Sequence, residues 1–510
     1  MRKDIYTIII VLFIGAGNLY AQVALNPNGD PPDPSAMLDV NSNNKGVLIP
    51  RMTLAEMNAI ENPAEGLMIY CTDCNVHGGL VTRHEESWSI MDRSVTKNGL
   101  IELPLLNQNY GGSSVEKAKD ISLTSDLGYF MVGATYSNDG DIGGNPNYYD
   151  YWVVKLNKNG YIIWETNLAS GSDDFGQSGQ QTDDGGYIVL GYSYTFSGNS
   201  NNYGKNDYWA VKLSDIGAVE WEKNFGGSDH DYGESILQTT DGGYILAGHT
   251  ESNDIDVTGN NGGYDYFIIK LFESGSIEWN TTLGGSDWDK ATDIKQTSDG
   301  GYIVTGYSGS SDGDVGGNNG NFDYWVVKLS STGILEWEKN LGGSGLEWAN
   351  SIQQTSDNGY ITAGYSGSSD GDVGGNNGSF DYWIVKLTSS GAIEWEKNYG
   401  GTNSEEAYSI IQTLDGGYLI AGSSNSNDGD IGGNQGMKDY WIVKVSSTGV
   451  MEWEKNLGGS NDDVAYSVKQ VADGGYIIMG DSGSSDGDVS ATYGNNDFWV
   501  VKLDADGNIQ

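Results

Sequence analysis

The sequence predicts an all-β protein: a seven-bladed β-propeller of four-stranded blades, closed by N- and C-terminal strands, that follows a small N-terminal module. Three observations carry this prediction. One segment recurs seven times, each copy holds four short runs rich in β-branched and aromatic residues, and the array contains a whole number of copies. The 510 residues also exceed what one hydrophobic core usually fills, which favours a repeat architecture.

The repeat is visible in the spacing of single residues. The tyrosine of a DGGY-type motif and the aspartate that opens a DYWVVKL-type motif each recur after 57 or 58 residues. Periods of this length are typical of stacked supersecondary units. The tyrosines are Tyr129, Tyr187, Tyr244, Tyr302, Tyr360, Tyr418 and Tyr476, and the aspartates are Asp150, Asp207, Asp265, Asp323, Asp381, Asp439 and Asp497.

Each copy predicts four strands. In the fifth copy they are ANSIQQT (349–355), GYITAGYS (359–366), DYWIVKL (381–387) and AIEWEKN (392–398), separated by turns of Gly, Asn, Asp and Ser. No segment between them has a helical period. Four antiparallel strands per copy match the blade of a propeller, and an open β-solenoid is the structural alternative.

The phase of the array decides between these two architectures. From Leu106 to Gln510 there are 405 residues, one fewer than seven copies of 58, and the array begins and ends inside a copy. A ring needs this arrangement if the N-terminal strand completes the blade that the C-terminal strands build, because no sheet edge then remains. A solenoid would carry atypical polar caps, and none is visible.

The N-terminus predicts export. Residues 1–21 have a basic start at Arg2 and Lys3, an apolar run and a small residue, Ala21, which together are typical of a secretory signal peptide. Residues 22–98 then form the small module and residues 99–510 the propeller. We expect a secreted or cell-surface protein without a membrane span, because no later segment approaches 18 consecutive apolar residues.

Charge excludes one class of partner. With 26 basic and 70 acidic residues the chain has a formal net charge of −44, which repels phosphate backbones and anionic lipid. Nucleic-acid binding is therefore not expected.

Two resemblances add to these expectations. The stretch SAMLDVNSNNKGVLIPRMTLAEMNAIENPAEGLMIYCTD resembles a module of exported Bacteroidota proteins and of some phage tail-fibre stems, which implies a surface or stalk role. The pattern DYWVVKL, ILEWEKNLGGS and DGGYI resembles repeat proteins of the Bacteroidota cell surface and is similar to kelch and quinoprotein-type propellers. Quinoprotein dehydrogenases have eight blades, which seven copies do not match. Some propellers of this appearance are described as endoglucanase-like.

Cys71 and Cys74 form a CTDC motif, with His77 and His84 nearby. Export favours a disulfide between the two cysteines. Two free thiols and a zinc site with the two histidines are the alternatives.

Paired aspartates recur in one loop of six copies and are candidate calcium ligands. The loop DGDVGGNNGNFD, 312–323, partly resembles an EF-hand loop, although strands flank it and its last position is aspartate. The alternative is that Asp, Asn and Gly form Asx-turns between strands. The second copy lacks the pair but keeps Asp207, which indicates a structural role for that aspartate, either capping a turn or pairing with a lysine. The paired residues are Asp139, Asp141, Asp254, Asp256, Asp312, Asp314, Asp370, Asp372, Asp428, Asp430, Asp486 and Asp488.

Other recurrent residues predict structure rather than chemistry. The lysine of the DYWVVKL motif occurs in all seven copies, whereas a catalytic lysine is needed once, so we expect ion pairs between blades. The tryptophans recur at strand spacing and are expected mainly in the core.

Differences between copies are concentrated after the GGS motif, where acidic residues and a few tryptophans gather. If these segments share one rim, that face is suited to sugars or cations, with Trp288, Asp289, Glu347 and Trp348 as candidate ligand-binding residues. A merely solvated rim is the alternative.

No nucleophile, metalloprotease, phosphate-loop or dinucleotide motif appears, and copies four to seven are nearly interchangeable. We therefore predict a non-enzymatic binding, adhesion or scaffold protein for carbohydrate or protein. The alternative is a glycoside hydrolase acting on polysaccharide, because carboxylates are abundant and propellers do host such sites.

Overall fold

The computed structural model describes most of the propeller: residues 106–143, 148–194, 203–490 and 492–510. Before it, the described residues are 23–25, 38–40, 51–53, 60, 67–71, 79–84 and 87–90. The chain divides into two compact units, 1–92 and 93–510, and each is considered by itself. The expected signal peptide lies outside the described residues. None of the described segments is a helix that could cross a membrane.

The described part of the first unit consists of short strands. β1 (Val23–Leu25) and β2 (Leu38–Val40) pair in parallel. A second sheet has the order β3 (Arg51–Met52), β4 (Met68–Cys71), β5 (Gly79–His84) and β6 (Ser87–Ile90). Cys74 and His77 and the side chains of Cys71 and His84 lie outside the described residues, so the disulfide stays a prediction.

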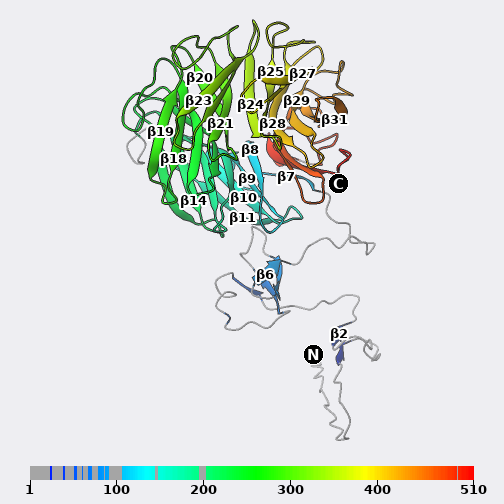
Figure 1. Cartoon of the computed structure of the whole chain (residues 1–510). Coiled ribbons are helices and arrows are strands. Elements are labelled where there is room, and N and C mark those ends of the chain that lie inside the picture. The colour runs from blue at the N-terminus through cyan, green and yellow to red at the C-terminus, as the bar shows by residue number, and fades with distance from the viewer. Residues whose placement is uncertain are drawn as a thin grey trace, which may run out of the picture. The chain divides into compact units, whose positions relative to one another are not determined.

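The second unit is a ring of seven four-stranded antiparallel sheets (Figure 1), which confirms the predicted fold class. Blade 1 contains β8 (Glu116–Leu123), β9 (Tyr129–Thr135), β10 (Asp150–Leu156) and β11 (Ile162–Leu168). Blade 2 contains β12 (Asp174–Gln181), β13 (Tyr187–Tyr194), β14 (Asn206–Leu213) and β15 (Val219–Phe225). Blade 3 contains β16 (Asp231–Gln238), β17 (Tyr244–Thr250), β18 (Asp265–Leu271) and β19 (Ile277–Leu283).

The next three blades repeat this arrangement. Blade 4 contains β20 (Asp289–Gln296), β21 (Tyr302–Ser308), β22 (Asp323–Leu329) and β23 (Leu335–Leu341). Blade 5 contains β24 (Glu347–Gln354), β25 (Tyr360–Ser366), β26 (Asp381–Leu387) and β27 (Ile393–Tyr399), close to the four predicted segments. Blade 6 contains β28 (Glu405–Gln412), β29 (Tyr418–Ser424), β30 (Asp439–Val445) and β31 (Met451–Leu457).

Blade 7 closes the ring with strands from both ends of the array. It contains β32 (Asp463–Gln470), β33 (Tyr476–Ser482) and β34 (Asp497–Leu503), and its fourth strand is β7 (Asn107–Tyr110). β7 pairs antiparallel with β34, with Tyr110 opposite Phe498. Figure 1 shows β7 beside the C-terminal strands, in red. The predicted closure is confirmed, and the open solenoid is excluded.

The strand order within a blade defines two faces of the ring. The first strands of successive blades lie next to one another around the axis, and the fourth strands lie outside. Connections from a fourth strand to the next blade, which contain the GGS motifs, share one face with the loops between second and third strands, which contain the DGD motifs. We call this the loop face. The turns between first and second and between third and fourth strands lie on the opposite face, the turn face.

Neighbouring blades are joined through a buried tyrosine in the third strand. The hydroxyl of Tyr324 donates a hydrogen bond to the backbone oxygen of Trp383 in the next blade, at 2.9 Å, and the two ring centroids lie 4.5 Å apart. The equivalent hydroxyl bonds come from Tyr151, Tyr208, Tyr266, Tyr382 and Tyr440. Blade 7 has Phe498 at this position, and its ring packs on Trp152 of blade 1 instead.

The recurrent lysine has a structural role, but within a blade. Lys328 is 2% exposed, and its Nζ lies 3.0 Å from Asp299 in the turn after the first strand and 3.1 Å from Glu336 on the fourth strand. All three residues belong to blade 4. The expectation of ion pairs between blades was therefore wrong, because the lysine side chain on the third strand reaches a turn and a strand of its own sheet.

The Tyr324→Phe substitution tests the junction. Removing the hydroxyl leaves a buried carbonyl oxygen without this donor, so the free energy of unfolding should fall by about 1 to 2 kcal/mol. Chemical denaturation measures the change. Tyr203→Phe is the matched control, because Tyr203 is exposed; an equal effect of both substitutions would contradict the role of the hydroxyl.

Candidate functional site

Two buried carboxyl groups meet at every blade junction, next to the GGS loop. At the junction of blades 4 and 5 they are Asp323 and Glu347, both 0% exposed. The backbone N–H of Gly343 donates to Glu347 Oε2 at 2.8 Å, and Ser366 Oγ donates to Oε1 at 2.8 Å. Asn319 N–H donates to Asp323 Oδ2 at 2.6 Å, so this aspartate caps a turn, one of the two roles expected for its position.

The same position holds Asp289, one blade earlier. It is 0% exposed and accepts hydrogen bonds from Gly285 N–H at 2.7 Å and Ser310 Oγ at 2.9 Å. Asp289 and Glu347 are therefore each enclosed by hydrogen bonds that hold a loop, and the ligand contact expected of them from the sequence stays a prediction. Trp288 and Trp348, the other two candidates, lie elsewhere on the loop face, as described below.

The paired aspartates of the DGD loops hold the GGS loops from the other side. Asp312 Oδ1 accepts from Ser286 N–H at 2.7 Å, and Asp314 Oδ2 accepts from Gly284 N–H at 3.2 Å. Both contacts recur at Asp139 and Asp141, Asp370 and Asp372, Asp428 and Asp430, and Asp486 and Asp488. In blade 3, Asp254 accepts from Ser228 N–H in the same way, whereas Asp256 contributes its backbone N–H, which donates to the backbone oxygen of Gly226. Turn chemistry accounts for these contacts.

No three acidic, histidine or cysteine side chains are arranged for a metal ion within the described ranges of the chain. That observation leaves calcium binding by the loops a prediction.

The third-strand aspartates of the junctions have raised pKa values. Burial, reinforced by Glu347, raises the pKa of Asp323 to about 7, and Oδ1 of Asp323 has no hydrogen-bond donor within the described structure. A proton shared between the two carboxyl groups would satisfy this atom. Burial likewise raises the pKa of Asp207 to about 8, of Asp265, Asp439 and Asp497 to about 7, and of Asp381 to about 6.

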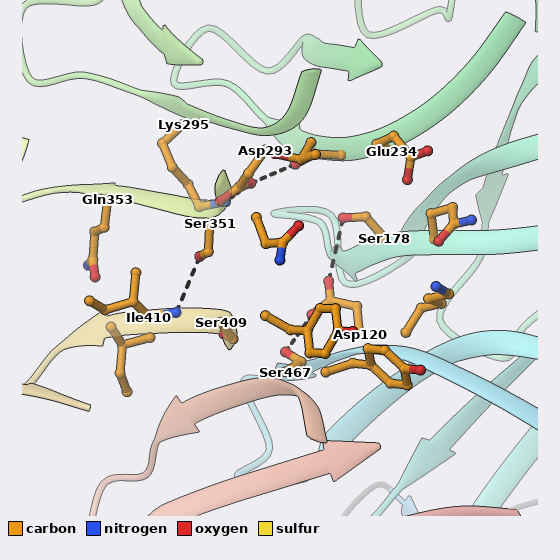
Figure 2. Close-up of a pocket in the computed structure, with 18 of the residues that line it drawn as sticks. Asp120, Ser178, Glu234, Asp293, Lys295, Ser351, Gln353, Ser409, Ile410 and Ser467 are labelled. Carbon is orange, nitrogen blue, oxygen red and sulfur yellow. Dashed lines mark hydrogen bonds and ion pairs between the residues drawn. The ribbon is translucent and has the colours of Figure 1, made fainter. Parts of the chain in front are cut away.

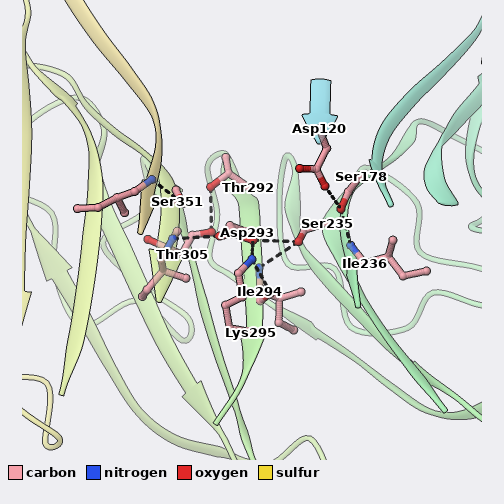
Figure 3. A network of polar contacts seen from close by, with 12 residues as sticks. Asp120, Ser178, Ser235, Ile236, Thr292, Asp293, Ile294, Lys295, Thr305 and Ser351 are labelled. Atoms are coloured by element: carbon pink, nitrogen blue, oxygen red, sulfur yellow. Dashed lines mark hydrogen bonds and ion pairs between the residues drawn. The ribbon is translucent and has the colours of Figure 1, made fainter. Parts of the chain in front are cut away.

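A central channel runs between the seven first strands and contains a cavity of about 430 Å³ (Figure 2). A belt of seven side chains lines it, one from each blade: Asp120, Ser178, Ser235, Asp293, Ser351, Ser409 and Ser467. Figure 3 shows part of the belt, in which Ser235 Oγ donates to Asp293 Oδ1 at 2.9 Å. Ser467 Oγ donates to Asp120 at 2.8 Å and closes the belt between blades 7 and 1. The first strands are thus held together around the axis.

A bulge in each first strand places a further residue in the cavity. The register of β24 against β25 shifts between Ala349 and Ser351, so Asn350 is the extra residue and lines the cavity. The third strands of the seven blades are nearly identical in sequence, whereas of the seven residues at this bulge position only the two tyrosines are alike. These residues are Lys119, Gln177, Glu234, Thr292, Asn350, Tyr408 and Tyr466. We call them the bulge ring. Sequence reasoning missed it; its signal was variation between copies inside a strand.

Aromatic side chains form a continuous arc on the loop face of blades 1 to 5. Successive ring centroids lie 4.8 to 6.4 Å apart, and Trp288, 47% exposed, is a member, as is Trp348. The aromatic arc contains Tyr136, Tyr149, Phe175, Tyr192, Tyr232, His249, Tyr264, Trp288, Phe322, Tyr307, Trp348, Tyr365 and Phe380. Some arc residues lie two positions from the bulge ring on the same strand, as Trp348 does from Asn350, so the arc borders the mouth of the channel.

Lysines outside the repeated strand motifs gather at this mouth. The propeller has 19 lysines and no arginine, and eleven of the lysines belong to repeated motifs. Of the other eight, six line the channel or contact residues at its mouth, where they offset the carboxylates: Lys117, Lys119, Lys290, Lys295, Lys438 and Lys469. Lys290 Nζ lies 3.9 Å from the ring centroid of Tyr264 in the aromatic arc.

Two carboxyl groups at the mouth have pKa values near neutrality. Burial raises the pKa of Glu234 to about 7, against the opposing effect of Lys119 and Lys290. Burial also raises the pKa of Asp481 to about 7, and the backbone N–H of Ala118 donates to this carboxyl group. Each therefore serves as hydrogen-bond donor or acceptor around pH 7.

Comparisons with known proteins bear on the two units separately. Residues 27–100 match the family described as "Phage tail like trimerisation region", which covers a minor part of the chain. Among curated proteins, none matches the sequence.

Solved structures resemble the propeller only distantly. Sqt1 from Chaetomium thermophilum is 10% identical with a TM-score of 0.41, over 79% of this chain and 86% of that one. Puromycin hydrolase is 12% identical with a TM-score of 0.45, over 80% and 55% of the two chains. A putative gluconolactonase is 10% identical with a TM-score of 0.33, over 64% and 87%. These similarities carry no argument about activity.

Stability should fall as pH rises through neutrality. The third-strand aspartates of the junctions have folded pKa values of about 6 to 8, above about 4 in the unfolded chain, so their contribution to stability is full below pH 4 and is lost up to pH 8. The turn aspartates, such as Asp299 with a pKa of about 2, stay ionised above pH 5. Differential scanning calorimetry from pH 5 to 8.5 should show a falling melting temperature, less steep in Asp323→Asn. A rising melting temperature would exclude the shared protons.

Calcium binding at the DGD loops is tested by the same measurement at fixed pH. If the paired aspartates bind calcium, excess calcium should raise the melting temperature above that in chelator, because a ligand that binds only the folded state stabilises it. Asp312→Asn should reduce the rise. Equal melting temperatures in calcium and in chelator would refute calcium binding.

Proposed function

We propose that the protein is an exported, non-enzymatic binding propeller that takes its ligand, a glycan or a protein, on the loop face at the mouth of the channel. The single observation that carries this proposal is where the copies differ. The buried strands repeat almost unchanged, whereas the bulge ring and the aromatic arc carry different side chains in successive blades. A purely structural ring has no need of such differences, while recognition of an asymmetric ligand does.

The chemistry of the mouth supports binding. Partly exposed aromatic rings supply apolar contact area, and the lysines, amides and hydroxyls beside them supply hydrogen bonds, the combination found in ligand sites. The surrounding acidic surface disfavours anionic polymers, with a net charge of −44. A passive scaffold would leave the arc without a role.

We further propose that the first unit joins three chains. Its similarity to a phage tail like trimerisation region supports this arrangement. Three loop faces on one stalk would raise the apparent affinity for a repetitive surface, because later contacts form at high effective concentration.

The glycosidase alternative is favoured by Glu234 and Asp481. A carboxyl group with a pKa of about 7 is suited to general acid catalysis, and two such groups border the same mouth.

A polysaccharide and protein panel separates the proposals. We expect retention of the purified protein on at least one surface polymer, without release of reducing ends, and loss of retention in Trp288→Ala but not in Ile334→Ala, an exposed residue of the turn face. Release of reducing ends that stops in Glu234→Gln would favour the glycosidase. Neither retention nor release would favour a scaffold.

The assembly proposal predicts three chains per particle. Light scattering coupled to size-exclusion chromatography of the full-length protein measures the mass. A particle of one chain at micromolar concentration would contradict trimerisation while leaving the propeller's role intact.

A further inference from the structure

We infer that the loop-side end of the channel is a subsite for one or two sugar rings of a neutral carbohydrate, with Tyr408 and Tyr466 as its platform. This inference rests on the proposed function and names the ligand class and the place where its end is held.

The cavity has the size and variety of lining that a small polyhydroxylated ligand needs. Its volume of about 430 Å³ lies toward the lower end of the range for ligand pockets, which suits one or two rings rather than a packed polymer. An ammonium, a carboxyl group, two amides and a hydroxyl line it from five different blades: Lys119, Glu234, Gln177, Asn350 and Thr292. Asn350 and Thr292 also donate hydrogen bonds to the backbone of the next blade, at 2.7 and 2.8 Å, and their side-chain oxygens can still accept from a ligand. A sugar ring presents hydroxyls in every direction around its edge, and such a circle of mixed donors and acceptors matches it.

Two tyrosines supply the apolar surface on the remaining side. The rings of Tyr408 and Tyr466, from blades 6 and 7, have centroids 5.0 Å apart and are tilted by 57°. The Tyr408 hydroxyl donates to Glu406 at 2.7 Å, and Lys438 lies 3.0 Å from the same carboxylate, so the ring is held in place. The C–H face of a pyranose packs on such aromatic faces, while burial raises the pKa of both phenols and keeps them neutral.

Charge selects a neutral ligand. The ammonium of Lys119 lies 5.0 Å from the ring centroid of Tyr466, and Lys469 and Lys295 pair with Asp120 and Asp293 in the belt, at 3.3 and 2.5 Å. The cations of the cavity are thus largely offset by its carboxylates, and residues 99–510 contain no arginine, the side chain whose planar fork binds phosphate or sulfate. Neither sign of charge dominates, whereas an anionic sugar would need a net positive site.

The aromatic arc provides the continuation of the subsite. Phe175, Tyr232 and Trp348 each lie two residues before a member of the bulge ring on the same first strand. A chain whose end enters the channel would therefore leave it across aromatic rings of blades 2 to 5. The end of the glycan, and not its middle, determines recognition in this geometry.

Calorimetric titration of the full-length protein with cellohexaose, xylohexaose, mannohexaose and maltohexaose tests the inference. At least one should bind, and Tyr408→Ala should weaken that binding about tenfold or more, because one sugar ring loses its platform. Asn350→Ala, a smaller change, should weaken it less, and Tyr203→Ala should have no effect. Melting temperatures identify any variant that fails to fold, in which case Asn350→Ala alone decides.

Three results would overturn the inference, and they differ from failure of the proposed function. The first is that none of the four hexasaccharides binds. The second is that the affinity is unchanged in a folded Tyr408→Ala variant or, if that variant does not fold, in Asn350→Ala. The third is that a sulfated hexasaccharide binds more tightly than a neutral one. If Trp288→Ala still abolishes retention on a polymer or protein, the loop face binds ligand and only the channel subsite is wrong.

Discussion

The hydrogen bond from a third-strand tyrosine to the backbone of the following blade is the contact on which the ring depends. A blade of four strands cannot bury both of its faces by itself, so each sheet needs its neighbours. The Tyr324 hydroxyl reaches a carbonyl at the centre of the next sheet, and the ring beside it packs on Trp383. Because the acceptor is a main-chain oxygen, the hydrogen bond positions the next sheet whichever side chain the acceptor residue carries.

The seam between blades 7 and 1 shows how the ring closes where the repeat is cut. There Phe498 lacks the hydroxyl, and packing against Trp152 replaces the hydrogen bond. Polar contacts from Asp481 to Ala118 and from Ser467 to Asp120 join the same two blades nearer the axis. The strand β7 adds main-chain pairing, so the last blade is tied to the start of the array by both backbone and side chains.

The sequence determined the fold almost completely and the site only in part. The strands and the closure of the ring could be predicted from the repeat length and from the point at which the array begins and ends. Seven copies of one pattern show which residues belong to strands more clearly than a single copy does. The burial of Asp289 and Glu347 could not be predicted, since a carboxylate in a variable segment looks exposed until its loop is seen to enclose it, and ligand contact by these two residues stays a prediction. The bulge ring was missed for a different reason: which strand is innermost, and that it carries an extra residue at Asn350, are consequences of three-dimensional closure.

The bulge in each first strand places one residue outside the pairing of the strands. Its extra residue, such as Asn350 in blade 5, has no register partner on the neighbouring strand, and its side chain projects toward the axis. Exchange of such a residue removes only its own bonds, such as those that Asn350 and Thr292 donate to the backbone of the next blade, and leaves the strand pairing, the belt and the tyrosine contacts intact. Seven positions, one in each blade, can thereby be substituted independently. Evolution or mutagenesis can change the residues that contact a ligand one blade at a time while the strands of the ring stay the same.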